Sequence, residues 1–93
     1  MDRFTKLLDD KKFYIADENK FSVDSRGYFG EAINRLGKFE DFYEELISGQ
    51  SQTQKELDKL RSEGKEKSYR YKELMGKKLT ENHILNLLKL YDL

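Results

Sequence analysis

The sequence predicts a mainly α-helical protein with a minor β contribution: one short N-terminal β-hairpin followed by three to four amphipathic helices. From Phe29 onwards the large apolar residues recur every three or four positions, which is the spacing of one face of a helix. Two short β-prone runs, residues 13–16 and 21–23, flank a polar turn at residues 17–20, a pattern typical of a hairpin. No proline interrupts the later helices.

Size and composition describe one small domain. The 93 residues are expected to form a hairpin region over residues 1–27 and a helical region over residues 28–93. Charged residues make up 39% of the chain, so long helix faces should be solvated. The formal net charge is zero, and no overall field therefore attracts nucleic acid or a membrane. The absence of cysteine excludes disulfides, zinc–thiolate sites and cysteine nucleophiles, and it fits a reducing cytoplasm.

The N-terminal elements follow from local signals. Residues 4–8 are apolar enough for one or two helical turns. In the hairpin, alternate residues of the two runs give one apolar face. Residues 24–27 are interpreted as the break before the first helix, with Asp24 or Ser25 as its N-cap. That helix is expected over residues 28–48, with Gly49 as its C-terminal stop.

The remaining helices are placed by caps and breaks. Residues 50–54 are polar and predict a loop, with a second helix beginning near Ser51 or Thr53. Gly64 should end that helix and Ser68 should cap the next one, although a single helix over residues 51–78 is the alternative. The third helix is expected over residues 68–78 and the fourth over residues 81–91, with Thr80 as N-cap between them.

Little in the chain points to catalysis. His83 is the only histidine, and a lone histidine without cysteine is seldom a metal ligand. The sequence has no phosphate-binding loop, nucleophile motif or dinucleotide fingerprint. We therefore predict no catalytic residue, no metal site and no cofactor.

An acidic cluster lies in the first predicted helix. Spacing of four aligns Glu40 with Glu44 and Asp41 with Glu45, so that two carboxylate pairs share one side. A cation site would need ligands from a second helix, and none is evident. A solvated face is the simplest interpretation. The same charge would suit a basic partner surface, and we predict that these four residues bind a partner protein.

A basic segment offers a different surface. Basic residues alternate with Tyr69 and Tyr71, as in proteins that bind single strands through phosphate contacts and base stacking. The basic residues are Lys65, Lys67, Arg70, Lys72, Lys77 and Lys78. Glutamates at positions 63, 66 and 73 dilute the patch, so nucleic-acid binding is the alternative rather than the main prediction.

The last predicted helix is too apolar for a helix with one face in water. Its apolar residues cover more than one stripe, so it is either the centre of the core or covered by a second chain. The second interpretation predicts a homo-oligomer that forms through Leu85, Leu88 and Tyr91.

Two stretches resemble segments of small uncharacterised phage and prophage proteins of Gram-positive bacteria. They are residues 30–41, with GEAINRL and FED, and residues 60–80, with LRSEGKEKS, YKEL and KLT. The resemblance implies a setting in the cytoplasm of a bacterial host, without a known activity. Small phage proteins that lack catalytic residues usually bind a host or phage macromolecule, and some inhibit by occlusion. We therefore predict a non-enzymatic interaction protein of this type, and as the alternative a nucleic-acid-binding phage regulator that uses residues 65–78.

Overall fold

A computed structural model describes residues 1–93. They divide into two units, Met1–Phe42 and Tyr43–Leu93. The elements in chain order are β1 (Thr5–Leu7), β2 (Tyr14–Ala16), the 3-10 turn η1 (Glu18–Lys20), β3 (Ser22–Asp24), β4 (Gly27–Phe29), α1 (Glu31–Ser62) and α2 (Tyr69–Leu90). The fold is mainly α-helical with a small β contribution, as predicted. It has two helices and two hairpins, however, instead of three to four helices and one hairpin.

The first hairpin pairs β1 with β2 in antiparallel register, with Lys6 opposite Ile15. Residues 4–8 are therefore largely extended, and the prediction of a helical turn there is wrong. The predicted pairing of residues 13–16 with 21–23 is also wrong. Residues 17–20, the supposed hairpin turn, instead contain η1, where the Lys20 amide donates to the Asp17 carbonyl at 3.0 Å. The chain beyond β2 enters a separate sheet.

The second hairpin pairs β3 with β4, with Val23 opposite Tyr28. Its turn is held by Asp24, whose carboxylate accepts from the Arg26 amide at 2.8 Å and from the Arg26 guanidinium at 2.6 Å. Gly27 follows with φ 128°, a conformation that favours glycine. These residues were expected to cap the first helix. That prediction is wrong, because they form this turn and α1 begins only at Glu31.

Gly30 connects the second hairpin to α1 and lies against η1. Its φ is 126°, and a Cβ atom at this position would lie 2.7 Å from the Lys20 carbonyl oxygen. Arg35, one turn into α1, stacks on Phe4 with its guanidinium carbon 3.6 Å from the ring centroid, and it donates to the Asp2 carbonyl at 2.5 Å. The start of α1 thereby holds the N-terminal segment of the first unit.

Helix α1 continues through the segment that was predicted to be a loop. Gly49 does not end it, and residues 50–54 are helical. A buried stripe explains the continuity: Leu46, Thr53 and Leu57 are buried, and they follow each other at helical spacing through the polar stretch. Packing of that face outweighs the roughly 1 kcal/mol that an interior glycine costs.

The connection between the helices was predicted correctly. Gly64 has φ 73°, its amide donates to the Arg61 carbonyl at 3.0 Å, and the Lys65 amide donates to the Leu60 carbonyl at 2.8 Å. This pair of bonds is a Schellman motif, which closes a helix at a left-handed glycine. Ser68 then caps α2, because its hydroxyl oxygen accepts from the Tyr71 amide at 3.2 Å.

Helix α2 continues through the junction expected at residues 79–80. Thr80 is not an N-cap: its hydroxyl donates to the Gly76 carbonyl one turn earlier, at 3.1 Å. A threonine inside a helix can satisfy its hydroxyl in this way, by donating to the carbonyl four residues before it. The predicted third and fourth helices are therefore one helix.

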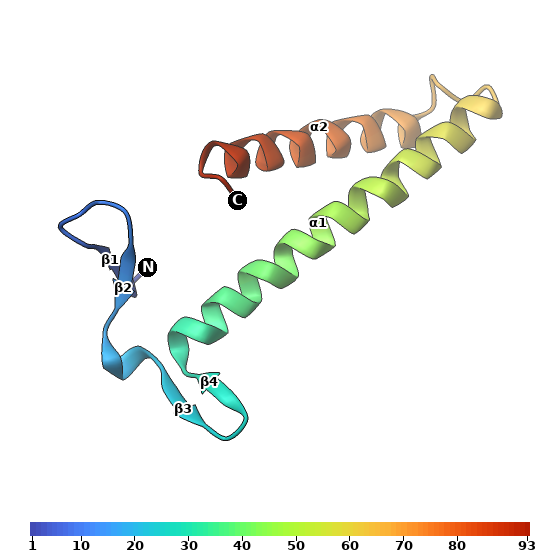
Figure 1. Ribbon diagram of the computed structural model, residues 1–93. Helices are drawn as coiled ribbons and strands as arrows, with labels where there is room; N and C mark the ends of the chain where they lie inside the picture. Colours follow the sequence, from blue (N-terminus) through green and yellow to red (C-terminus); the bar gives the residue numbers. More distant parts are fainter. The chain divides into compact units, whose positions relative to one another are not determined.

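In the second unit, α2 runs back antiparallel to α1 (Figure 1). The centre of the packing is Leu57, which has no exposed surface, together with the buried Leu46 and Leu74. Two polar residues, Thr53 and Glu81, are buried with them. The helix pair thus has a small apolar core with polar groups inside it.

Candidate functional site

The four acidic residues predicted to bind a partner all lie on α1 and are exposed. At 100° per residue they point away from the face that buries Leu46. None of the carboxylates of Glu40, Asp41, Glu44 and Glu45 takes part in any of the ion pairs of the structure. The helix therefore presents four uncompensated negative charges within six consecutive residues.

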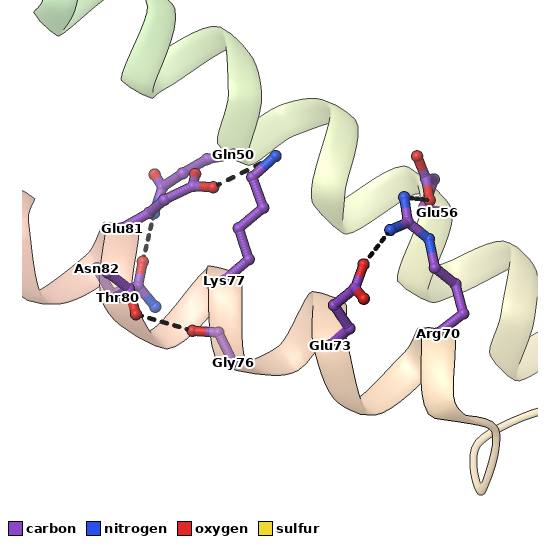
Figure 2. Close-up of polar contacts among 9 residues, drawn as sticks. All are labelled: Gln50, Glu56, Arg70, Glu73, Gly76, Lys77, Thr80, Glu81 and Asn82. Carbon is purple, nitrogen blue, oxygen red and sulfur yellow. Dashed lines mark hydrogen bonds and ion pairs between the residues drawn. The ribbon is translucent and has the colours of Figure 1, made fainter.

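Half of the basic residues of the second surface, Lys65, Arg70 and Lys77, form ion pairs with acidic neighbours. Arg70 pairs with Glu56 of α1 at 2.9 Å and with Glu73 at 2.5 Å (Figure 2). The bond to Glu56, and then the bond to Glu73, raise the pKa of the Arg70 guanidinium above its ordinary value. Lys65 pairs with Glu63 at 3.0 Å, and this hydrogen bond lowers the pKa of the Glu63 carboxyl.

The same residues do not gather on one face. Lys65 and Lys67 precede α2, while the others are distributed along it. Helical spacing separates Lys72, Lys77 and Lys78 by large angles around the axis, and Lys78 is half-buried. Of the two tyrosines, Tyr69 is exposed, whereas the Tyr71 hydroxyl accepts a hydrogen bond from Arg61 of α1 at 2.8 Å. The structure thus forms no continuous stripe of free cations and stacking rings.

The residues predicted to mediate self-association occupy two environments. Leu85 and Leu88 are half-buried and continue the spacing of the buried Leu74 and Glu81 along one face of α2. Tyr91 follows the helix and is 78% exposed. Leu79, Leu87 and Leu90 are also exposed, so α2 carries apolar side chains on both its packed and its open side.

Sequence reasoning missed the polar contacts between the helices. Figure 2 shows Gln50 of α1 reaching α2, where its amide donates to the Asn82 side-chain oxygen. Beside this pair lies Glu81, which is only 7% exposed and whose two carboxylate oxygens accept no hydrogen bond. Its single ion pair is with Lys77, at 3.9 Å.

The signal for this polar layer is present in the spacing. Positions 46, 53 and 60 on α1 and positions 74, 81 and 88 on α2 are each seven apart, and the middle one in each helix is polar. Seven residues are two helical turns, so a polar residue at such a position faces the partner helix.

No group of three histidine, aspartate or glutamate side chains is placed to hold a metal ion. His83 is exposed on α2. In the first unit, a groove of about 430 Å³ lies beside Phe4 and Arg35. Its lining is mostly apolar side chains and brings no acid, base or nucleophile set together.

Neither helix is both long and apolar enough to cross a membrane. Comparison of the chain with protein-family models, with curated proteins and with solved structures finds no match.

Proposed function

We propose that this chain is a non-enzymatic interaction protein whose acidic face, formed by Glu40, Asp41, Glu44 and Glu45, binds a basic surface on a host or phage protein. The proposal keeps the setting implied by the resemblance, the cytoplasm of a bacterium infected by a phage. Binding stoichiometrically at such a surface, the chain would inhibit its target by occlusion.

The observation that carries the proposal is the contrast between the two charged surfaces. The four carboxylates of α1 are exposed and have no ion-pair partner. Arg70, Lys65 and Lys77 already pair with glutamates of the same chain. A free like-charged face attracts an opposite partner and speeds encounter, whereas internally paired charges contribute little to either.

The contrast also weighs against nucleic-acid binding through residues 65–78. Nucleic-acid binding requires free lysine and arginine side chains, which neutralise phosphates and thereby release the counterions condensed on the nucleic acid. Here half of the basic side chains would first have to break an ion pair with a glutamate. We therefore keep this alternative only as an outcome of the test.

The test compares two variants of equal charge. One carries Glu40→Gln, Asp41→Asn, Glu44→Gln and Glu45→Gln. The control neutralises four scattered exposed acids that make no ion pair, Asp2, Asp9, Glu18 and Glu66. Tagged wild type and control should capture the same protein from infected host cells, and the acidic-face variant should lose it.

With the captured protein purified, the acidic-face variant should associate at least about tenfold more slowly than the control at low salt. Added salt should remove that difference, because it screens charges beyond about 10 Å at 0.1 M. Equal association rates for the two variants would overturn the proposal. Capture of DNA or RNA that is lost in a Lys67→Gln, Arg70→Gln, Lys72→Gln variant would instead support the nucleic-acid alternative.

A further inference from the structure

The groove of the first unit combines an apolar lining with two arginine side chains. Its volume of about 430 Å³ falls within the range of about 300–1,000 Å³ that is typical of small-molecule sites. The lining comes from the N-terminal segment and from the first turns of α1, and it contains no aspartate or glutamate. The residues that matter for a ligand are Arg3, Phe4, Ala32, Arg35, Leu36 and Phe39.

The apolar side of the groove follows from the sequence of α1. Ala32, Leu36 and Phe39 recur every three or four residues and therefore lie on one side of the helix. Phe4 lines the groove with them, and the guanidinium carbon of Arg35 lies 3.6 Å from the centroid of its ring. Leu36 is 53% exposed, so a ligand that covered it would remove apolar surface from water.

The two arginines keep unused hydrogen-bond donors. Arg3 donates through Nε to the Thr5 carbonyl at 2.8 Å, and Arg35 donates through one terminal nitrogen to the Asp2 carbonyl at 2.5 Å. Two nitrogens of each guanidinium therefore have no acceptor, and neither arginine takes part in an ion pair. These bonds to backbone carbonyls restrain the guanidinium groups without neutralising their charge, which suits them to bind a carboxylate.

The surroundings of the Phe4 ring add further positive charge. The Lys20 ammonium lies 5.2 Å from the ring centroid, and Lys38 lines an adjoining hollow beside the same ring. Glu31 is the one carboxylate in that hollow, and it pairs with Lys20 at 3.5 Å. Together with the two arginines there are four cationic side chains and one carboxylate, so the local charge favours an anionic ligand.

We propose that this groove binds a small apolar carboxylate, a molecule that consists of a hydrocarbon chain or ring and one carboxylate group. The hydrocarbon part covers Leu36 and its apolar neighbours, and the carboxylate accepts N–H groups of Arg3 and Arg35. The inference goes beyond the proposed function, because it concerns a different site and a different class of ligand. None of the four carboxylates of the acidic face lines the groove.

The first experiment uses octanoate as probe, with octanol and acetate as controls. Octanol has a similar chain without the charge, and acetate has the charge without the chain. NMR titration of the wild type should show saturable shifts of the Phe4 and Leu36 amide signals with octanoate. Both controls should bind at least about tenfold more weakly, since each lacks one half of the recognised chemistry. Octanol or acetate binding as tightly as octanoate, or octanoate shifts that do not saturate, would overturn the inference.

The second experiment locates the site with two matched pairs of variants. Arg3→Gln removes a cation of the groove, whereas Lys6→Gln removes an exposed cation outside it. Leu36→Gln removes an exposed apolar side chain of the groove, whereas Ile33→Gln removes one outside it on the same helix. We expect Arg3→Gln to weaken octanoate about tenfold without changing octanol, and Leu36→Gln to weaken both ligands.

The two variants outside the groove should bind like the wild type, and equal effects within either pair would overturn the inference. The NMR spectra also show whether each variant is folded. If Arg3→Gln or Leu36→Gln does not fold, the comparison of the three ligands on the wild type decides alone.

The acidic-face variant keeps this inference separate from the proposed function. When folded it should bind octanoate at least as tightly as the wild type does, because it has lost only negative charge. If octanoate binds as expected while this variant still captures the partner, the groove stands and the proposed function fails. If octanoate does not bind while the variant loses the partner, the groove is overturned and the proposed function stands.

Discussion

Gly30 and Lys20 touch through their backbones: a Cβ atom on Gly30 would lie 2.7 Å from the Lys20 carbonyl oxygen and 2.8 Å from the Phe21 Cα. The contact brings the first turn of α1 against the end of η1. Because both sides are backbone, neither can rotate away as a flexible side chain would. The backbone of the first unit therefore has no room for a side chain at position 30, not even the methyl group of alanine.

We therefore expect Gly30→Ala to destabilise the first unit by about 2 kcal/mol or more, from overpacking together with an unfavourable positive φ. The matched control is Gly37→Ala in the same unit. Gly37 lies inside α1 with nothing within 4 Å of a Cβ, so alanine should stabilise the helix by about 1 kcal/mol. Thermal denaturation followed by NMR signals of residues 21–29 measures both. Equal shifts for the two variants would contradict the expectation.

Acid should loosen the β3–β4 turn. The hydrogen bond from the Arg26 side chain, followed by that from its backbone amide, lowers the pKa of Asp24 below its ordinary value. A carboxyl whose pKa is lower in the folded chain than in the unfolded chain stabilises the fold. This stabilisation is fully present at pH values above the unfolded-state pKa of about 4. This contribution is lost as the pH falls through the folded-state pKa.

NMR shifts of Arg26 and Gly27 followed through an acid titration check this, with Asp24→Asn as the comparison. The asparagine variant keeps an acceptor but not the charge, so its turn should respond much less to pH in this range. A wild-type turn whose shifts change no more than those of the asparagine variant through the whole acid titration would contradict the prediction, since protonation removes the charged partner of Arg26.

Self-association through α2 stays a prediction, and the exposed residues make it testable without disturbing the core. Leu87→Glu with Leu90→Glu changes two exposed side chains, so the fold should survive while any oligomer weakens through charge repulsion. Leu88→Asp, at a half-buried position, should weaken both the oligomer and the fold. Light scattering over a concentration series provides the measurement, with Ser48→Glu and Gln52→Glu on α1 as the control. A wild type that remains monomeric at every concentration would exclude this association.

Local chemistry made some elements predictable. Gly64 and Ser68 act on backbone groups only a few residues away, so the end of α1 and the start of α2 follow from residue type and position. The exposure of Glu40 and its neighbours follows likewise from helical spacing. Thr80 has the residue type of a cap, but the apolar spacing on either side continues one helix through it.

Which segments of the chain pack against each other was not predictable in the same way. Whether β2 pairs with residues 4–8 or with residues 21–23 depends on packing between segments, and the local spacing of residues 4–8 favoured a helical turn. The pairing of Arg70 with Glu56 and the burial of Glu81 depend on the register of two antiparallel helices. Single-helix spacing cannot set that register, although polar residues at seven-residue intervals indicate which positions face the partner helix.

The connection at Gly64 also sets an order of events when the helix pair forms and opens. Three side-chain hydrogen bonds join the helices, and they differ in how far apart in the sequence their residues are. The separation is 10 for Arg61–Tyr71, 14 for Glu56–Arg70 and 32 for Gln50–Asn82. Shorter loops close at lower entropic cost, so the helices should zip together from the connection outwards. Separation then begins at the far end, and amide hydrogens there should exchange with solvent before those near Leu57. Glu81, which lies beside Gln50 and is buried in the closed pair, should therefore become hydrated when that end frays, without global unfolding.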